Sequence, residues 1–169
     1  MTSRFLLIAW LLCTVACSTD FDLDRAKAPV ELTATEFSDL EDFNHKFLMH
    51  LGTMYSRKEK LINGVLFNEA FIDLQVSDFE GTPLQLDLYQ LRTTSLAVDR
   101  IIFRKDSVVR YVLKEMVDQN TEGWSRSYTH EVVFNPLNLQ YGWYQCEKFR
   151  EAGIKPGWYS LAYACNVGQ

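Results

Sequence analysis

Short stretches of alternating apolar and polar residues run through most of the chain after residue 71, and this period of two constrains the fold more than any other feature. Ile72, Leu74 and Val76 alternate with polar residues, and the same alternation returns further on. Such a pattern is typical of strands that bury one face and expose the other. We expect strands at residues 72–76, 84–88, 97–103, 107–117, 126–134, 139–149 and 157–167.

The connections between these expected strands are short, and several contain turn-forming residues, as at 80–83. Short connections favour antiparallel pairing of neighbouring strands, because a parallel pair needs a long crossover. An antiparallel meander can close into a barrel or remain an open sheet. We expect a mainly β fold in which the meander closes into a barrel.

One segment before the strands has the period of a helix. Leucines and phenylalanines recur at helical spacing between residues 40 and 51, with charged residues between them. Ser38 and Glu41 have the spacing of a capping box, in which both side chains bond N–H groups of the first turn. Gly52 supplies a stop signal. We therefore expect one N-terminal amphipathic helix over about residues 37–51, covering the mouth or open face of the sheet.

The chain begins like an export signal. Arg4 precedes an apolar run at residues 5–15, and small residues follow near Cys17. This run is too short for a bilayer-spanning helix, which needs about 20 residues, and the pattern fits a cleaved signal peptide. The expected organisation is a signal peptide at 1–17, an extended leader at 18–34 and a single β-barrel-like domain at 35–169.

Export predicts a secreted protein, with lipid attachment through Cys17 in a bacterial envelope as the alternative. No later stretch reaches the length of a membrane-spanning helix, so we expect no transmembrane segment in the mature chain. The net charge is −5 at pH 7. A negative chain does not attract phosphate backbones, so nucleic acid is not an expected partner.

Two cysteines remain well beyond the signal, Cys146 and Cys165, and each ends an aromatic stretch. If their segments form a hairpin that turns at residues 155–157, the two cysteines lie nearly opposite each other. Cross-strand partners are about 4.5–5.5 Å apart, close to the separation that a disulfide needs. An oxidising compartment favours the bond. We therefore expect a Cys146–Cys165 disulfide that staples the last hairpin.

The C-terminal strands are rich in aromatic residues, which could form a wall that grips a flat apolar ligand. The same residues could equally pack in a core beside the disulfide. A histidine among apolar residues of the 126–134 stretch could contact the ligand or be a hydrogen-bonded core residue. The candidate ligand-binding residues are Tyr128, His130, Trp143, Tyr144, Tyr159 and Tyr163.

Motifs of catalysis are missing from the sequence. The three histidines do not have metal-ligand spacing, and there is no Gly-x-Ser-x-Gly motif or Gly-rich phosphate loop. We therefore predict no catalytic residue, no metal and no cofactor, and we favour a protein that is not an enzyme. Four arginines could pair with carboxylates of a ligand at a barrel rim, or could face solvent and discourage edge pairing. They are Arg92, Arg100, Arg104 and Arg110.

Three short motifs resemble the CpcT/CpeT-type chromophore lyase family, over about residues 40–165. They are Leu48-Met49-His50-Leu51-Gly52-Thr53-Met54-Tyr55-Ser56, Leu88-Tyr89-Gln90, and the late pair Cys146 and Cys165. The stretch 52–55 is also similar to the Gly-x-Trp-Tyr signature of lipocalins. Both resemblances imply a lipocalin-like barrel, and the first also implies bilin lyase activity.

These features together predict a secreted, disulfide-bonded β-barrel that binds a small apolar or tetrapyrrole-like ligand. Aromatic residues make up 14% of the chain, a composition that favours strands and a ligand-lined interior. One alternative is an extracellular structural or matrix protein without a ligand. The other is an enzyme of the bilin lyase type.

Overall fold

The structure is a computed structural model that describes residues 28–61, 72–93, 96–104, 108–113, 116–119, 125–139 and 146–167. Its helices are α2 (Ala34–Met49), α3 (Leu51–Leu61), α4 (Gln85–Thr93) and the 3-10 helix η1 (Val76–Phe79). Its strands are β1 (Ile72–Gln75), β2 (Val98–Phe103), β3 (Val109–Leu113), β4 (Met116–Gln119), β5 (Ser125–Phe134), β6 (Cys146–Lys155) and β7 (Trp158–Val167). The predicted signal peptide and most of the predicted leader lie outside the described residues.

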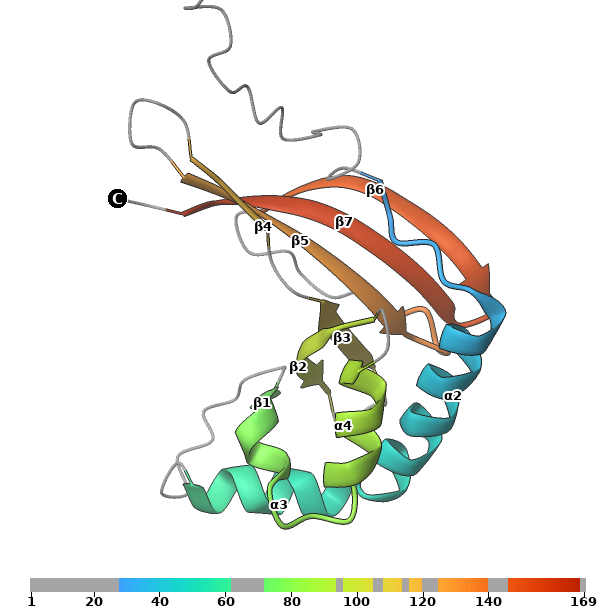
Figure 1. Cartoon of the computed structure of the whole chain (residues 1–169), viewed down its shortest axis with the longest axis vertical. Coiled ribbons are helices and arrows are strands. Elements are labelled where there is room, and N and C mark those ends of the chain that lie inside the picture. The colour runs from blue at the N-terminus through green and yellow to red at the C-terminus, as the bar shows by residue number, and fades with distance from the viewer. Residues whose placement is uncertain are drawn as a thin grey trace, which may run out of the picture.

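The strands form one antiparallel sheet in the order β1-β2-β3-β5-β7-β6, with β4 paired to β5 beside this path. The mainly β, antiparallel fold is therefore confirmed. Among the described strands, β1 and β6 lie at opposite ends and do not pair, so the sheet is open and the predicted barrel is not closed. Figure 1 shows this sheet curving over the helices. A strand inserted out of chain order, β7 between β5 and β6, also separates the fold from a simple meander.

Residues 84–88, which alternation predicted as a strand, belong to helix α4 and its N-terminal edge. In a strand, Leu86 would share a buried face with Leu84 and Leu88, but its side chain is 75% exposed. Leu84, Leu88 and Leu91 are buried instead, and their spacing is that of one helical face. The strand predicted at 84–88 is therefore wrong, and the sheet has one strand fewer with which to close.

The helix predicted at 37–51 exists, but its start and end differ from the prediction. Thr33 caps α2, because its hydroxyl accepts from the Glu36 N–H at 3.3 Å and the Glu36 carboxylate accepts from the Thr33 N–H at 2.7 Å. Ser38 lies inside the helix, so the capping box predicted there is wrong. Gly52 does not stop the helical segment either, because α3 follows α2 after a break at His50.

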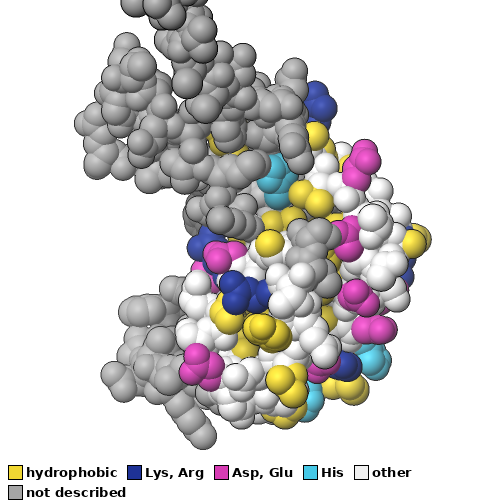
Figure 2. All heavy atoms as spheres, in the orientation of Figure 1, with side chains coloured by type: hydrophobic (Ala, Val, Ile, Leu, Met, Phe, Trp, Pro, Cys, Tyr) yellow, Lys and Arg dark blue, Asp and Glu magenta, His cyan; other side chains and the backbone are white. Residues whose placement is uncertain are grey.

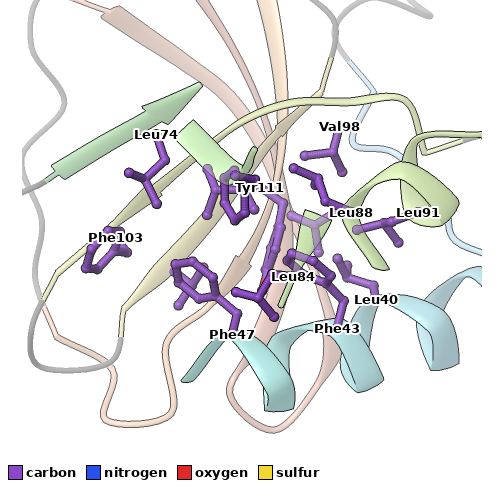
Figure 3. Packing of buried hydrophobic residues seen from close by; sticks show 14 of the residues in the cluster. Leu40, Phe43, Phe47, Leu74, Leu84, Leu88, Leu91, Val98, Phe103 and Tyr111 are labelled. Carbon is purple, nitrogen blue, oxygen red and sulfur yellow. The ribbon is translucent and has the colours of Figure 1, made fainter. Parts of the chain in front are cut away.

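The core lies between the helices and one face of the sheet. Figure 3 shows side chains of α2 and α4 pointing toward those of the strands. The ring of Phe47 meets Phe103 edge-on with centroids 5.4 Å apart, and Tyr111 stacks on Trp158 at 6.2 Å. The buried Tyr111 hydroxyl donates to Asn44 Oδ1 at 2.7 Å, which satisfies both polar groups inside an apolar core.

The predicted C-terminal hairpin forms from β6 and β7, although β6 continues to Lys155, beyond the end predicted at residue 149. Its turn contains Gly157 at φ +81°, and a Cβ there would lie 3.1 Å from the Pro136 Cα. Glycine is therefore required for both conformation and space. Lys155 pairs with Glu41 of α2 and lies 4.7 Å from the Phe37 ring centroid, so the hairpin is also tied to the helix.

The strand registers divide the sheet side chains into two faces. Val132 and Trp158 pack in the cluster that contains the helical side chains, whereas their neighbours Val133 and Leu161 pack in a second buried cluster. Within the described part of the chain, this second cluster contains no helical residue. We call the first the helix-covered face and the other the second face.

Candidate functional site

Tyr128 and His130, two of the predicted ligand contacts, are buried on the helix-covered face of β5. The register places them opposite Ala164 and Ala162 of β7, which are also buried. Because the two alanines are small, side chains rise little above this part of the sheet. Its surface combines apolar groups with the polar groups of the tyrosine and the histidine. The predicted alternation of β5 is confirmed, and the role in ligand binding remains a prediction.

Tyr159 and Tyr163 lie on the second face, so they are not on the same side of the sheet as Tyr128 and His130. Tyr159 is half-buried against the second cluster, and Tyr163 is buried. Tyr159 and Tyr163 therefore share one face of β7. A ligand on one face cannot contact all four residues.

The remaining predicted site residues are described only in part. Trp143 and Tyr144 lie outside the described residues. The backbone register places Cys146 of β6 directly opposite Cys165 of β7, as the position of the turn predicted. The disulfide between them remains a prediction.

The second face holds a buried ionic network centred on Glu131, whose side chain is fully buried. Arg110 donates from Nε to Glu131 Oε2 at 2.8 Å and from Nη2 to Oε1 at 2.7 Å. The Tyr163 hydroxyl donates to Oε1 at 2.6 Å. This forked pairing holds the carboxylate in one geometry, so Arg110 binds a carboxylate of its own chain rather than one of a ligand.

The chemistry of this network is that of a closed structural contact. Burial, followed by the negative charge of Glu131, raises the pKa of the Tyr163 hydroxyl well above its usual value. A phenol held in its neutral form is a poor base at neutral pH. The network therefore stabilises the second face.

An apolar pocket with a volume of about 350 Å³ opens between η1 and α4. Its apolar walls come from both helices, and charged or amide side chains lie at its margin. Leu86 and Tyr89 project from α4 beside it and are 75% and 66% exposed. The lining residues are Val76, Phe79, Glu80, Gln85, Leu86, Leu88, Tyr89 and Arg92. The site can hold a small apolar molecule, because two large side chains already lie in water next to a hollow.

Sequence analysis missed this pocket because it depends on α4 being a helix. In the strand predicted for 84–88, Leu86 would have pointed into the core. The signal that could have found it is the spacing of Leu84, Leu88 and Leu91, which leaves Leu86 and Tyr89 three residues apart on another helical face.

A second hollow, of about 200 Å³, lies between α2 and α4 and is mostly polar. Lys46 and Asp87 form an ion pair across it, which ties the two helices together. Asp39 and Asp42 also line it. Within the described residues, no three His, Cys, Asp or Glu side chains are arranged to hold a metal ion. None of the helices in the described part of the chain is both long and apolar enough to cross a bilayer.

Comparison of the chain with protein-family models, curated proteins and solved structures finds no match. We therefore infer the function from the geometry of the described residues.

Proposed function

We propose that the protein is an exported binding protein that takes up a small apolar molecule in the pocket between η1 and α4. The observation that carries this proposal is the pocket itself. It has a volume of about 350 Å³, and the exposed side chains of Leu86 and Tyr89 are among those that line it. Ligand pockets typically measure about 300–1,000 Å³. The volume lies near the lower limit, which favours a ligand smaller than a tetrapyrrole.

The walls of the pocket support binding by apolar burial. Phe79 and Leu88 are buried and form its interior, whereas Leu86 and Tyr89 stand at its edge. A ligand that covers these edge residues removes apolar surface from water, which gives roughly 25 cal/mol for each Å² buried. Figure 2 shows hydrophobic side chains reaching the surface beside basic ones over the helical end of the molecule.

Calorimetric titration of the purified protein with 1-octanol tests this proposal. We expect saturable binding that Leu86→Glu weakens by roughly tenfold or more, since a carboxylate at the pocket edge must be desolvated when the ligand binds. Leu137→Glu is the matched control, because Leu137 is 66% exposed in the loop after β5 and does not line the pocket. Absence of saturable binding would favour the alternative of a structural protein without a ligand.

We also propose that Cys146 and Cys165 form a disulfide in an oxidising compartment. The register that pairs these two residues supports the bond, because antiparallel partners have the separation that a disulfide needs. Thiol titration of the unfolded, unreduced protein should find neither cysteine reactive, and both should react after reduction. Two reactive thiols before reduction would contradict the bond.

A further inference from the structure

Among the described residues that line the pocket between η1 and α4, Arg92 is the one cation. It is exposed near the C-terminal end of α4, and it lies on the same helical face as Leu88 and Tyr89. We infer that the pocket takes an amphipathic monocarboxylate, whose apolar part lies on Leu86, Leu88 and Tyr89 and whose carboxylate pairs with Arg92. This inference rests on the proposed function and adds the chemical class of the ligand.

The guanidinium of Arg92 is held in place by only one of its nitrogens. Its Nε donates to the Val98 carbonyl at 2.8 Å, which anchors the group between α4 and β2. Among the described residues, no carboxylate pairs with Arg92, and its side chain lines the pocket, so its Nη groups can donate to a bound ligand. A carboxylate accepts two parallel bonds from such a fork.

The other arginines that sequence analysis singled out have different surroundings. Both bonding nitrogens of Arg110 are taken up by Glu131. Arg100 lies 3.7 Å from a carboxylate oxygen of Asp73. Arg92 therefore combines a fixed orientation with a position at an apolar pocket, which the paired arginines lack.

The polar groups at the margin of the pocket also give it a direction. Gln85 and Arg92 are seven residues apart on α4, which corresponds to roughly 10 Å along the helix axis. Glu80 lies at the Gln85 end of the pocket, next in sequence to η1. A ligand carboxylate is attracted to the Arg92 end, and the described lining residues offer no second cation for another carboxylate, so a ligand with one carboxylate fits better than one with two.

Titration with octanoate and 1-octanol, which share a chain length and differ in charge, tests the inference. We expect the purified protein to bind octanoate more tightly than 1-octanol by up to roughly fivefold, because an ion pair at an exposed arginine contributes at most about 1 kcal/mol. Arg92→Gln should remove that difference and leave the affinity for 1-octanol unchanged. Arg150→Gln, which removes an exposed cation of β6 outside the pocket, should preserve it.

Arg92→Lys tests whether the effect of Arg92→Gln comes from the lost contact with Val98. Lysine also lacks this contact and the fork, but it keeps the positive charge. We expect it to retain part of the preference for octanoate, with an unchanged unfolding midpoint. Equal affinities of the unsubstituted protein for the two probes, or a preference that survives in Arg92→Gln, would overturn the inference and leave the proposed function standing. Failure of both probes to bind would overturn both. Dimerisation that Leu86→Glu abolishes, without binding of either probe, would show that the pocket face receives a second copy of this chain.

Discussion

On the helix-covered face of the sheet, aliphatic and aromatic side chains of α2, α3, α4 and η1 pack on those of the strands, whereas on the second face Arg110 and Tyr163 hold the buried carboxylate of Glu131. Apolar packing is non-directional, so each side chain contributes according to the volume that it fills. A buried ionic network is directional, and its value depends on every partner being present. The two faces should therefore differ in the stability that they lose when one side chain is removed. They should also differ in how much of that stability a second substitution restores.

The largest effect is expected on the second face. Glu131→Ala leaves the Arg110 guanidinium, whose side chain is only 11% exposed, without its carboxylate. Removal of one partner of a buried pair typically costs about 3–5 kcal/mol, so we expect the free energy of unfolding to fall by about 4 kcal/mol. Chemical denaturation measures this loss.

The double substitution Arg110→Met with Glu131→Leu sharpens this test. Replacement of a buried ion pair by apolar residues of similar size is often neutral or stabilising. We expect the double variant to be more stable than Glu131→Ala alone. Equal stability of the two variants would show that the second face does not depend on the pairing.

The next effect is expected on the helix-covered face, from Leu40→Ala. Leu40 is fully buried in the core cluster, and truncation of such a leucine leaves a cavity. We expect a loss of about 3 kcal/mol in urea unfolding. Met49→Ala is the control in the same helix, because Met49 is exposed and its loss should change stability by less than about 0.5 kcal/mol.

Tyr163→Phe should have a smaller effect, since it removes one hydrogen bond to a charged group and keeps the ring. Such bonds contribute about 1.5–3 kcal/mol, so we expect a loss of about 2 kcal/mol at neutral pH. A loss as large as that of Glu131→Ala would mean that the tyrosine, and not the arginine, dominates the network.

Alkaline pH tests the contribution of the same tyrosine to stability. The pKa of Tyr163 is raised in the folded protein above the usual value of about 10. Its contribution to stability is therefore complete below pH about 10 and is lost as the pH rises toward the folded pKa. Tyr163→Phe should flatten this decline. The raised pKa of the buried Tyr111 on the helix-covered face leaves a remaining slope.

The smallest effect concerns the cap of α2. Thr33→Ala removes the side-chain oxygen that accepts from Glu36 and should cost about 1 kcal/mol. Ser38→Ala should leave the unfolding midpoint nearly unchanged, because Ser38 is exposed inside the helix. A larger loss of stability in Ser38→Ala than in Thr33→Ala would instead support the helix start that was predicted from the sequence.

Local patterns predicted several strands, although 84–88 belongs to a helix and the strand expected at 107–117 is divided into β3 and β4. The 97–103 and 126–134 segments form β2 and β5, and the turn at Gly157 sets the register of the last hairpin. These features depend on neighbours in sequence, namely alternation and turn residues. Closure of the barrel could not be predicted in the same way, because it depends on pairing between the first and last strands.

The candidate site was harder to predict for the same reason. Leu84, Leu86 and Leu88 satisfy the period of a strand, and only burial shows that Leu86 lies outside the core. Arg92 was identified as a potential carboxylate partner, but the four arginines looked alike in sequence. Burial of Glu131 beside Arg110 depends on the pairing of β3 with β5, which brings together residues 21 positions apart.

A crystal structure of the purified protein with octanoate tests the central claim most directly. The account predicts the alkyl chain between η1 and α4, in contact with Leu86 and Tyr89, and the carboxylate on Arg92. Octanoate bound instead on the sheet beside Tyr128 and His130, with the η1–α4 pocket empty, would contradict it.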